Sequence, residues 1–435
     1  MRTVNVAIVG FGTVGSGVAR ILLDSGDSLA ARAGVQLHLK YVCDTDLQRP
    51  RDVAVPQELL TDSLDRVLAD GDVEIVCELI GGTTVAYDVV ERALKAGKHV
   101  VTANKALLAE RGMPLMKLAR DQGLAVSFEA AVAGGIPLIL AVRDGLVANR
   151  ITAIAGIVNG TCNYILTRMY NEGTPYEEAL RAAQAIGYAE TDPTLDVSGR
   201  DSAHKLTILG RLAFSAPITF EDVYCEGIEG IQPCDVRYGD ELGYIIKLLA
   251  IGQLDPSGGV NLRVHPSFVP KGNPLAYVAD AYNAIMVHGN AVGDTLYYGR
   301  GAGRMPTASA VVADIVDTAL GRATLTFAKR DMFGEDAARR VRPIDDIRAR
   351  YYLRFDVIDE PGVLASIAGI LGSHTISIAS VLQHEPTDAE HVALIIMTHA
   401  ALERNMRTAL GDIEQLGTVR SRPVYIRVTD QEDGP

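Results

Sequence analysis

The chain lacks the features of secreted, membrane-spanning or nucleic-acid-binding proteins. Its five cysteines form an odd set without a Cys-x-x-Cys pair, which argues against a disulfide framework or a zinc site. It has no run of about 18 apolar residues that could span a bilayer, and its first residues lack the features of a signal peptide. The formal net charge of −13 disfavours nucleic acid or an anionic membrane as a partner. We therefore expect a cytoplasmic protein with no nucleic-acid and no membrane partner.

The composition is that of a globular protein, with 48% hydrophobic and 22% charged residues over a length of 435, enough for two or three domains. In the first part, strand-like segments alternate with helix-like segments. Strands are expected at 4–9, 36–43, 73–79 and 99–102, and the clearest helices at 86–96 and 114–122. This alternation predicts an α/β fold with a parallel, doubly wound sheet of the Rossmann type.

A glycine-rich turn follows the first expected strand and precedes a helix. It consists of Gly10, Phe11, Gly12, Thr13, Val14 and Gly15. In this fingerprint the first glycine permits a tight turn, the second lets the backbone approach a pyrophosphate, and the third allows close packing of the helix. The helix N-terminus then offers free N–H groups to the phosphates. The strand–turn–helix context predicts a dinucleotide-binding site.

The sequence leaves the choice between NAD and NADP open. Asp44 and Asp46 follow the second expected strand and are candidates to bind the adenosine ribose, which would favour NAD. Arg49 and Arg51 follow closely and are candidates to bind a 2′-phosphate, which would favour NADP.

The most informative stretch covers residues 183–205, where acidic residues precede a lysine: Glu190, Asp192, Asp196 and Asp201, then Lys205. Asp201 and Lys205 are four residues apart and share one face of a helix. Apolar Ile208 and Leu212 continue that face, so the lysine is expected on a core-facing line. The simpler alternative is a solvated ion pair on the helix surface. The apolar continuation favours a functional site.

Two further segments have both a functional and a plain structural interpretation. Lys105 follows the strand at 99–102, where the carboxyl ends of parallel strands bind ligands, but it could equally open the next helix. Glu129 precedes a backbone bent by glycine and proline, whose carbonyl groups could bind a hard cation. An interdomain turn explains that segment equally well.

The C-terminal part predicts a separate small domain. Strands are expected at 351–357, 375–383, 391–398 and 424–428, with helices ending near residue 373 and spanning 401–416. The order βαββαβ is that of a ferredoxin-like domain. We interpret the charged segment before this domain as a linker.

The sequence resembles the homoserine dehydrogenase family over nearly its whole length. The resemblance rests on the glycine turn, residues 102–105, 159–161 and 301–309, and above all residues 183–205. The tail from residue 351 resembles an ACT domain through residues 359–362 and 376–383. Cys43 departs from the pattern, because many members have a basic residue there, which weakens the case for NADP. In the tail, residues 373–375 replace the small or Asn/Gly residues often found before Ile-Ser-Ile, which weakens the case for effector binding.

The resemblance implies reversible reduction of L-aspartate 4-semialdehyde to L-homoserine with NAD or NADP. It implies that Lys205 donates a proton to the substrate, that Asp201 and Glu190 bind it, and that Lys105 lies near both nicotinamide and substrate. Gly187 and Gly303 would lie where the family closes on the cofactor. A sodium ion would bind at Glu129, Val132, Gly134 and Ile136, chiefly through backbone carbonyls. Threonine is implied as an effector of the ACT domain, and a homodimer or homotetramer as the assembly.

We expect a Rossmann domain at 1–137 and 305–325, with an inserted α+β catalytic and dimerisation domain at 138–304. A linker at 326–350 and an ACT domain at 351–430 would follow. Two alternatives remain at this point. One is another NAD(P)-dependent dehydrogenase of a small amino acid, such as an aspartate dehydrogenase. The other is a non-catalytic regulator that senses amino acids and binds a nucleotide.

Overall fold

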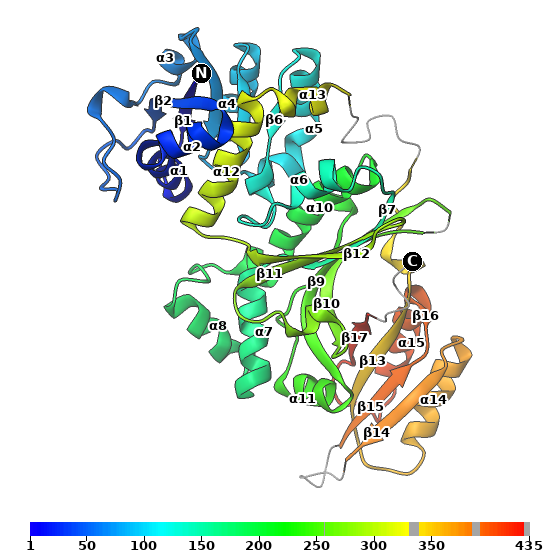
Figure 1. The fold of residues 1–435 in the computed structure, drawn as a ribbon. Helices are drawn as coiled ribbons and strands as arrows, with labels where there is room; N and C mark the ends of the chain where they lie inside the picture. The colour runs from blue at the N-terminus through cyan, green and yellow to red at the C-terminus, as the bar shows by residue number, and fades with distance from the viewer. Residues whose placement is uncertain (256, 330–338, 385–391, 430–435) are drawn as a thin grey trace. The chain divides into compact units, whose positions relative to one another are not determined.

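The protein is described here by a computed structural model, which covers residues 1–435 except 256, 330–338, 385–391 and 430–435 (Figure 1). The residues outside the described ranges include part of the expected linker and the first residue of the strand expected at 391–398. The described chain divides into two units. The first contains Met1–Ile151, Asp201–Glu221 and Tyr282–Arg340, and the second Thr152–Arg200, Asp222–Ala281 and Val341–Pro435. Within the described ranges, no helix combines the length and apolar character needed to cross a bilayer.

A parallel sheet forms the centre of the first unit, with strand order β3-β2-β1-β4-β5-β6. This is the order of a dinucleotide-binding Rossmann fold, as the alternation of segments predicted. The strands are β1 (Arg2–Val9), β2 (Val35–Cys43), β3 (Leu60–Thr61), β4 (Val73–Glu78), β5 (His99–Thr102) and β6 (Val126–Ser127). Buried strands with near-continuous Val, Ile and Leu are typical of a sheet covered on both faces.

Helices cover this sheet, and one of them returns from far along the chain. α12 packs beside α1 (Figure 1), where a Cβ on Gly17 would lie 2.9 Å from the Cβ of Ala308. Val311 and Ile315 of α12 join the core formed by β1. The helices of this unit are α1 (Thr13–Asp24), α2 (Gly26–Ala33), α3 (Leu64–Ala69), α4 (Val85–Lys95), α5 (Lys105–Asp121), α6 (Leu138–Leu140), α10 (Arg200–Phe214, from Asp201 onward), α12 (Arg304–Ala319) and α13 (Arg322–Lys329). A hairpin of β11 (Tyr282–Gly289) and β12 (Gly293–Arg300) completes it.

The helix expected at 114–122 is longer than predicted, because α5 begins at Lys105 and contains Pro114 in its interior. A proline there removes one backbone hydrogen bond. Leu107, Leu108 and Leu115 on the same helix are fully buried, and burying each such side chain contributes roughly 1.5–3 kcal/mol. Burial therefore outweighs the proline's local preference for a helix start.

The second unit is built on a mixed sheet with strand order β7-β9-β10-β17-β13-β15-β14. These strands are β7 (Ile151–Ile157), β9 (Tyr244–Leu254), β10 (Val260–Pro270), β17 (Val424–Val428), β13 (Arg348–Val357), β15 (Val392–Thr398) and β14 (Ile378–Gln383). Short strands β8 (Tyr224–Cys225) and β16 (Ala401–Leu402) pair with β10 and β13. Its helices are α7 (Gly160–Glu172), α8 (Tyr176–Ala185), α9 (Thr194–Val197), α11 (Pro233–Glu241), α14 (Val363–Ser373) and α15 (Glu403–Glu414).

The C-terminal part has the predicted ferredoxin-like order β13-α14-β14-β15-α15-β17. Its strands lie in the order β17-β13-β15-β14, and its apolar core includes Tyr351, Phe355 and Ile367. β17 also pairs in parallel with β10, where Ser267 is opposite Arg427. The sheet of this small domain therefore continues the sheet that precedes it in the chain.

Candidate active site

The glycine-rich turn has the geometry of a phosphate-binding loop. Gly10 has a φ of +103°, and a Cβ there would lie 2.6 Å from the backbone oxygen of Leu79. A Cβ on Gly15 would lie 2.0 Å from the oxygen of Gly10, whereas one on Gly12 would meet nothing within 4 Å. Gly12 is the N-cap of α1 and provides no side chain to cap its N–H groups. The backbone at Gly12 is therefore accessible to a bound pyrophosphate.

Asp44 lies directly beside this turn. Its Oδ2 accepts a 2.5 Å hydrogen bond from the N–H of Phe11, and Oδ1 accepts one from Asp46 at 2.9 Å. Arg51 donates from Nε to the oxygen of Phe11 at 2.7 Å and lies 3.6 Å from Asp44. Both the carboxylate and the guanidinium group that the sequence singled out therefore border the expected ribose site.

Lys105 is held at the end of β5 by a small polar network. The Asn104 side chain caps α5 by accepting from the N–H of Leu107 at 3.0 Å, and donates to the oxygen of Gly82 at 2.7 Å. Thr102 accepts from the N–H of Asn104 and donates to the buried Glu78 carboxylate at 2.7 Å. Lys105 is therefore the first residue of α5, as the structural interpretation of this segment predicted. These hydrogen bonds hold the backbone that precedes it.

Asp201 lies between the two lysines. Its Oδ2 is 2.7 Å from Nζ of Lys205, and its Oδ1 is 3.2 Å from Nζ of Lys105. The side chains of Asp201 and Lys205 are 10% and 11% exposed, and that of Lys105 is 40% exposed. The pair is therefore not a solvated ion pair. Two ammonium groups held around one carboxylate are suited to stabilising an oxyanion.

Two contacts that the sequence did not reveal hold α10 against α5 and so set the spacing of the lysines. Buried Arg211 donates to the backbone oxygens of Leu108, Ala109 and Ile218 at 2.6–2.7 Å. His204 lies 3.1 Å from Glu110 and packs on Phe220, and burial lowers its pKa. No spacing rule connects residues about a hundred positions apart, so only the tertiary structure could identify them.

The loop at 129–136 has an unusual backbone conformation. Ala133 and Gly134 have φ values of 55° and 43°, and a Cβ on Gly134 would lie 2.5 Å from the oxygen of Gly301. The oxygen of Ile136 accepts from Leu138, but no hydrogen bond to the buried oxygens of Val132 and Gly134 is found in the described structure. The described side chains contain no cluster of three His, Cys, Asp or Glu that could hold a metal, so a cation here would rely on carbonyl oxygens.

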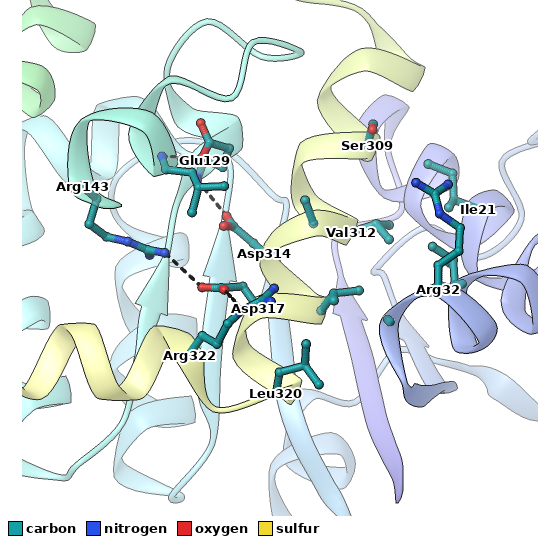
Figure 2. Close-up of a pocket in the computed structure, with 15 residues that line it drawn as sticks. Ile21, Arg32, Glu129, Arg143, Ser309, Val312, Asp314, Asp317, Leu320 and Arg322 are labelled. Atoms are coloured by element: carbon teal, nitrogen blue, oxygen red, sulfur yellow. Dashed lines mark hydrogen bonds and ion pairs between the residues drawn. The ribbon is translucent and has the colours of Figure 1, made fainter. Parts of the chain in front are cut away.

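The Glu129 side chain forms hydrogen bonds with the backbone near it. Its carboxylate accepts from the N–H groups of Ile139 and Leu140 at 2.8 Å. Its own N–H donates to Asp314 at 2.7 Å (Figure 2). Burial, together with the nearby Glu129, raises the pKa of Asp314 well above its usual value. Glu129, Leu140 and Asp314 line a cavity of about 480 Å³, where Arg143 contacts Asp317 (Figure 2). This hydrogen bonding anchors the loop at 129–136 to α12.

The remaining predicted residues belong to other segments. Gly303, with a φ of +121°, is the N-cap of α12 in the first unit. Gly187 (φ +76°) and the exposed Glu190 lie in the second unit. There the Asn159 side chain caps α7 and donates to Asp196 at 2.7 Å. The first unit thus brings Lys105, Asp201 and Lys205 together, and Glu190 belongs to the other unit.

Comparisons with known proteins match the whole chain. Family models match at residues 10–129 (homoserine dehydrogenase, NAD binding domain), 137–316 (homoserine dehydrogenase) and 351–418 (ACT domain). The chain is 43% identical to the homoserine dehydrogenase of Neisseria gonorrhoeae, with 100% of each covered. The chain belongs to the homoserine dehydrogenase family. A solved homoserine dehydrogenase from Thiobacillus denitrificans is similar at 43% identity and a TM-score of 0.93, with 99% of each chain covered.

Membership of the homoserine dehydrogenase family confirms the main functional prediction. The protein is a nicotinamide-dependent oxidoreductase that interconverts L-aspartate 4-semialdehyde and L-homoserine, and the two alternatives are set aside. A hyperthermophilic archaeal homoserine dehydrogenase mutant in complex with NADPH is also similar, at 27% identity and a TM-score of 0.62 over 73% of this chain and 98% of that one.

Proposed function

We propose that Lys205 is the proton donor in aldehyde reduction by this homoserine dehydrogenase. When bound, the nicotinamide supplies the hydride. The carbonyl oxygen then becomes an alkoxide, which takes a proton from Nζ of Lys205. The contact of Asp201 with both lysines carries this proposal, because it keeps two ammonium groups beside one carboxylate. A cationic pair of this kind stabilises and protonates developing negative charge.

The other residues of the site orient Lys205 or bind the substrate and the cofactor. Asp201 positions Lys205 and contributes to substrate binding, and Lys105 stabilises charge near the nicotinamide and the substrate. Glu190, a carboxylate without a recorded partner in the described structure, binds the substrate ammonium group. Gly187 and Gly303 lie near the cofactor, and both have positive φ values, a backbone conformation that glycine adopts without strain.

The cofactor is NADP or NAD, held by residues 10–15 and Lys105. The open space at Gly12 supports a pyrophosphate beside the turn. Asp44 supports contacts to ribose hydroxyls, while Arg49 and Arg51 support a 2′-phosphate. The archaeal relative in complex with NADPH makes NADPH a suitable first cofactor for assays.

A sodium or other monovalent cation binds at the backbone oxygens of Glu129, Val132, Gly134 and Ile136. Two buried carbonyl groups without a recorded donor support this assignment. The expected result is a higher melting temperature in sodium chloride than in choline chloride at equal ionic strength, because an ion that binds only the folded state stabilises it. Equal melting temperatures in the two salts would speak against the site.

The assembly, the effector and the compartment are also proposals. The edge strand β12 exposes Leu296 and Tyr298, which supports a homodimer or homotetramer formed through this region. Threonine is the proposed effector of the ACT domain. All five cysteines are free thiols, in keeping with the reducing cytoplasm.

The Lys205→Ala variant tests the proton-donor role. We expect kcat for aldehyde reduction to fall by roughly 10²–10⁴-fold, the usual range for loss of a general acid, while NADPH affinity stays unchanged. Lys117→Ala, an exposed lysine on α5 paired with Asp121, is the matched control. Full turnover of Lys205→Ala with an unchanged pH profile would contradict the assignment.

A further inference from the structure

Arg51 follows β2 in the chain and packs against the glycine turn. Its guanidinium carbon lies over the ring of Phe11, 4.7 Å from the ring centroid. Nε donates to the oxygen of Phe11 at 2.7 Å, and Nη1 donates to the oxygen of Arg49 at 2.7 Å. Nη2 lies 3.6 Å from Oδ2 of Asp44. Each of the three guanidinium nitrogens therefore has a partner within the protein.

These contacts leave Arg51 poorly suited to binding a phosphate of the cofactor. Its side chain is only 10% exposed, and its position over an aromatic ring adds a cation–π contact. A bidentate phosphate contact needs two parallel N–H groups of the guanidinium fork. To offer them to a 2′-phosphate, the group would have to give up Phe11 or Asp44. Arg51 is therefore better suited to holding the turn in place.

Asp44 is held beside the turn, immediately after the last residue of β2. Oδ2 accepts from the N–H of Phe11 at 2.5 Å, and Oδ1 accepts from the N–H of Asp46 at 2.9 Å. An ionised carboxylate has about four lone-pair positions, so both oxygens can still accept from hydroxyl groups. A carboxylate at this position of a Rossmann fold suits ribose hydroxyl groups and repels a phosphate.

The other residues of this segment do little to offset the charge of Asp44. Cys43 is buried and carries no positive charge. Arg304, at the start of α12, pairs with Asp52 at 2.5 Å. The Arg49 side chain is exposed and has no recorded partner within the described structure, so it is still available to a 2′-phosphate. An exposed arginine that must first be ordered contributes little to such a contact.

We propose that Arg51 is a positioning residue of the cofactor site and that the enzyme prefers NAD(H) to NADP(H). Arg51 holds Phe11 and Asp44 together, and Asp44 accepts hydrogen bonds from the adenosine ribose hydroxyl groups. A 2′-phosphate removes one of those donors and brings negative charge to the carboxylate. This rests on the proposed function, in which residues 10–15 hold the cofactor, and adds the choice between the two cofactors.

Direct binding to the full-length enzyme, measured by isothermal titration calorimetry, tests the preference without turnover. The probes are NADH, NADPH, ADP-ribose and 2′-phospho-ADP-ribose, and the last two report on the adenosine half alone. We expect the 2′-phosphorylated member of each pair to have a Kd at least tenfold higher. Equal or tighter binding of the phosphorylated member in either pair would overturn the preference. Binding of none of the four probes would instead contradict the assignment of the cofactor to residues 10–15.

Asp44→Asn tests the carboxylate as the residue that determines specificity. The amide keeps an acceptor for the N–H of Phe11 but removes the charge. We expect the Kd for NADH to rise about tenfold, as for loss of a charged hydrogen bond, while the Kd for NADPH stays equal or falls. The ratio of the two Kd values should therefore drop to about threefold or less. A ratio as large as that of the parent enzyme would show that Asp44 does not set the preference.

Arg51→Lys distinguishes a positioning residue from a phosphate ligand, because lysine keeps the charge but lacks the planar fork. NADH has no 2′-phosphate, so only a positioning role predicts weaker NADH binding, by about threefold or more. An unchanged Kd for NADH would overturn the role of Arg51. Arg66→Lys is the matched control, since Arg66 also lies over an aromatic ring, 5.3 Å from the centroid of Tyr41. Its affinity for NADH should equal that of the parent enzyme.

Discussion

At the scale of single residues, the active-site lysine depends on the acid beside it. Lys205 could not stay nine-tenths buried without a counter-charge, because desolvating an ammonium group costs several kcal/mol. Asp201 offsets that cost at 2.7 Å and also reaches Lys105. The two ammonium groups that Asp201 holds beside it are suited to stabilising an alkoxide.

Lys247 of β9 shows the opposite case, a buried lysine without a carboxylate partner among its recorded hydrogen bonds. Nζ donates to the oxygen of Val278 at 2.6 Å and to Oδ1 of Asn163 at 3.1 Å. Burial lowers the pKa of Lys247 to about 8 from its usual 10.5. Between these two pH values the unfolded chain binds more protons than the folded chain, so folding stability rises with pH across that window.

We therefore predict a specific pH dependence for Lys247→Met. The unfolding free energy of the parent minus that of the variant should increase by roughly 3 kcal/mol between pH 8 and pH 10.5, at 1.36 kcal/mol per pKa unit. Urea denaturation of both proteins at steps of half a pH unit measures this difference. A difference that stays constant over the window would mean that Lys247 has an ordinary pKa in the folded protein.

The sequence predicted part of the residue-level picture. The four-residue spacing of Asp201 and Lys205, continued by Ile208, indicated a lysine on a buried helix face, and Ile208 is indeed fully buried. Neither Lys247 nor the bonds of Arg211 to α5 could be anticipated. Their partners are distant in sequence, and local periodicity carries no information about them.

At the scale of elements, the strand–turn–helix at the N-terminus is the part most fully determined by local sequence. Each position favours glycine for a separate physical reason. These are the positive φ at Gly10, the close backbone contact at Gly15 and the open space at Gly12. In contrast, the sequence left the start of α5 open between Lys105 and Pro114, because proline is typical of a first helical residue. The structure decides for Lys105, with Leu107 and Leu108 buried in the first turns.

This difference between the glycines predicts separable effects. Gly15→Ala should lower the unfolding free energy by about 1–3 kcal/mol, because its Cβ would overlap the Gly10 backbone. Gly12→Ala should change stability by less than about 0.5 kcal/mol but weaken NADPH binding about tenfold or more, because the methyl group occupies the approach of the pyrophosphate. Thermal melting and NADPH fluorescence titration measure the two effects. Equal NADPH affinity in Gly12→Ala would place the pyrophosphate elsewhere.

At the scale of the whole molecule, the ACT domain is joined to the preceding part of its unit more tightly than its sequence pattern suggests. The sequence indicated a charged linker and then a separate βαββαβ domain, and the order of those strands and helices is confirmed. The parallel pairing of β17 with β10 joins residues far apart in the chain, and no turn or motif in the sequence predicts such a pairing. The same region buries Asp235 of α11 against Tyr352 and Arg354 of β13, at 3.0 and 2.7 Å.

That buried ion pair leads to a prediction about how the ACT domain contributes to stability. Arg354→Met should lower the unfolding free energy by about 3–5 kcal/mol, because it leaves the fully buried Asp235 carboxylate without its cation. The double variant Asp235→Asn/Arg354→Met should lose clearly less, since the amide keeps an acceptor for Tyr352 without a buried charge. Urea denaturation of the three proteins measures both differences.

The exposed ion pair between Arg404 and Asp346 provides the control, and Arg404→Met should cost no more than about 1 kcal/mol. A loss in Arg354→Met as small as that of the control would show that the two parts of the unit are only loosely joined. A large loss would mean that deleting residues after 350 removes structural support as well as regulation. Threonine regulation is then properly tested in the full-length chain, where the buried pair of Asp235 and Arg354 stays intact.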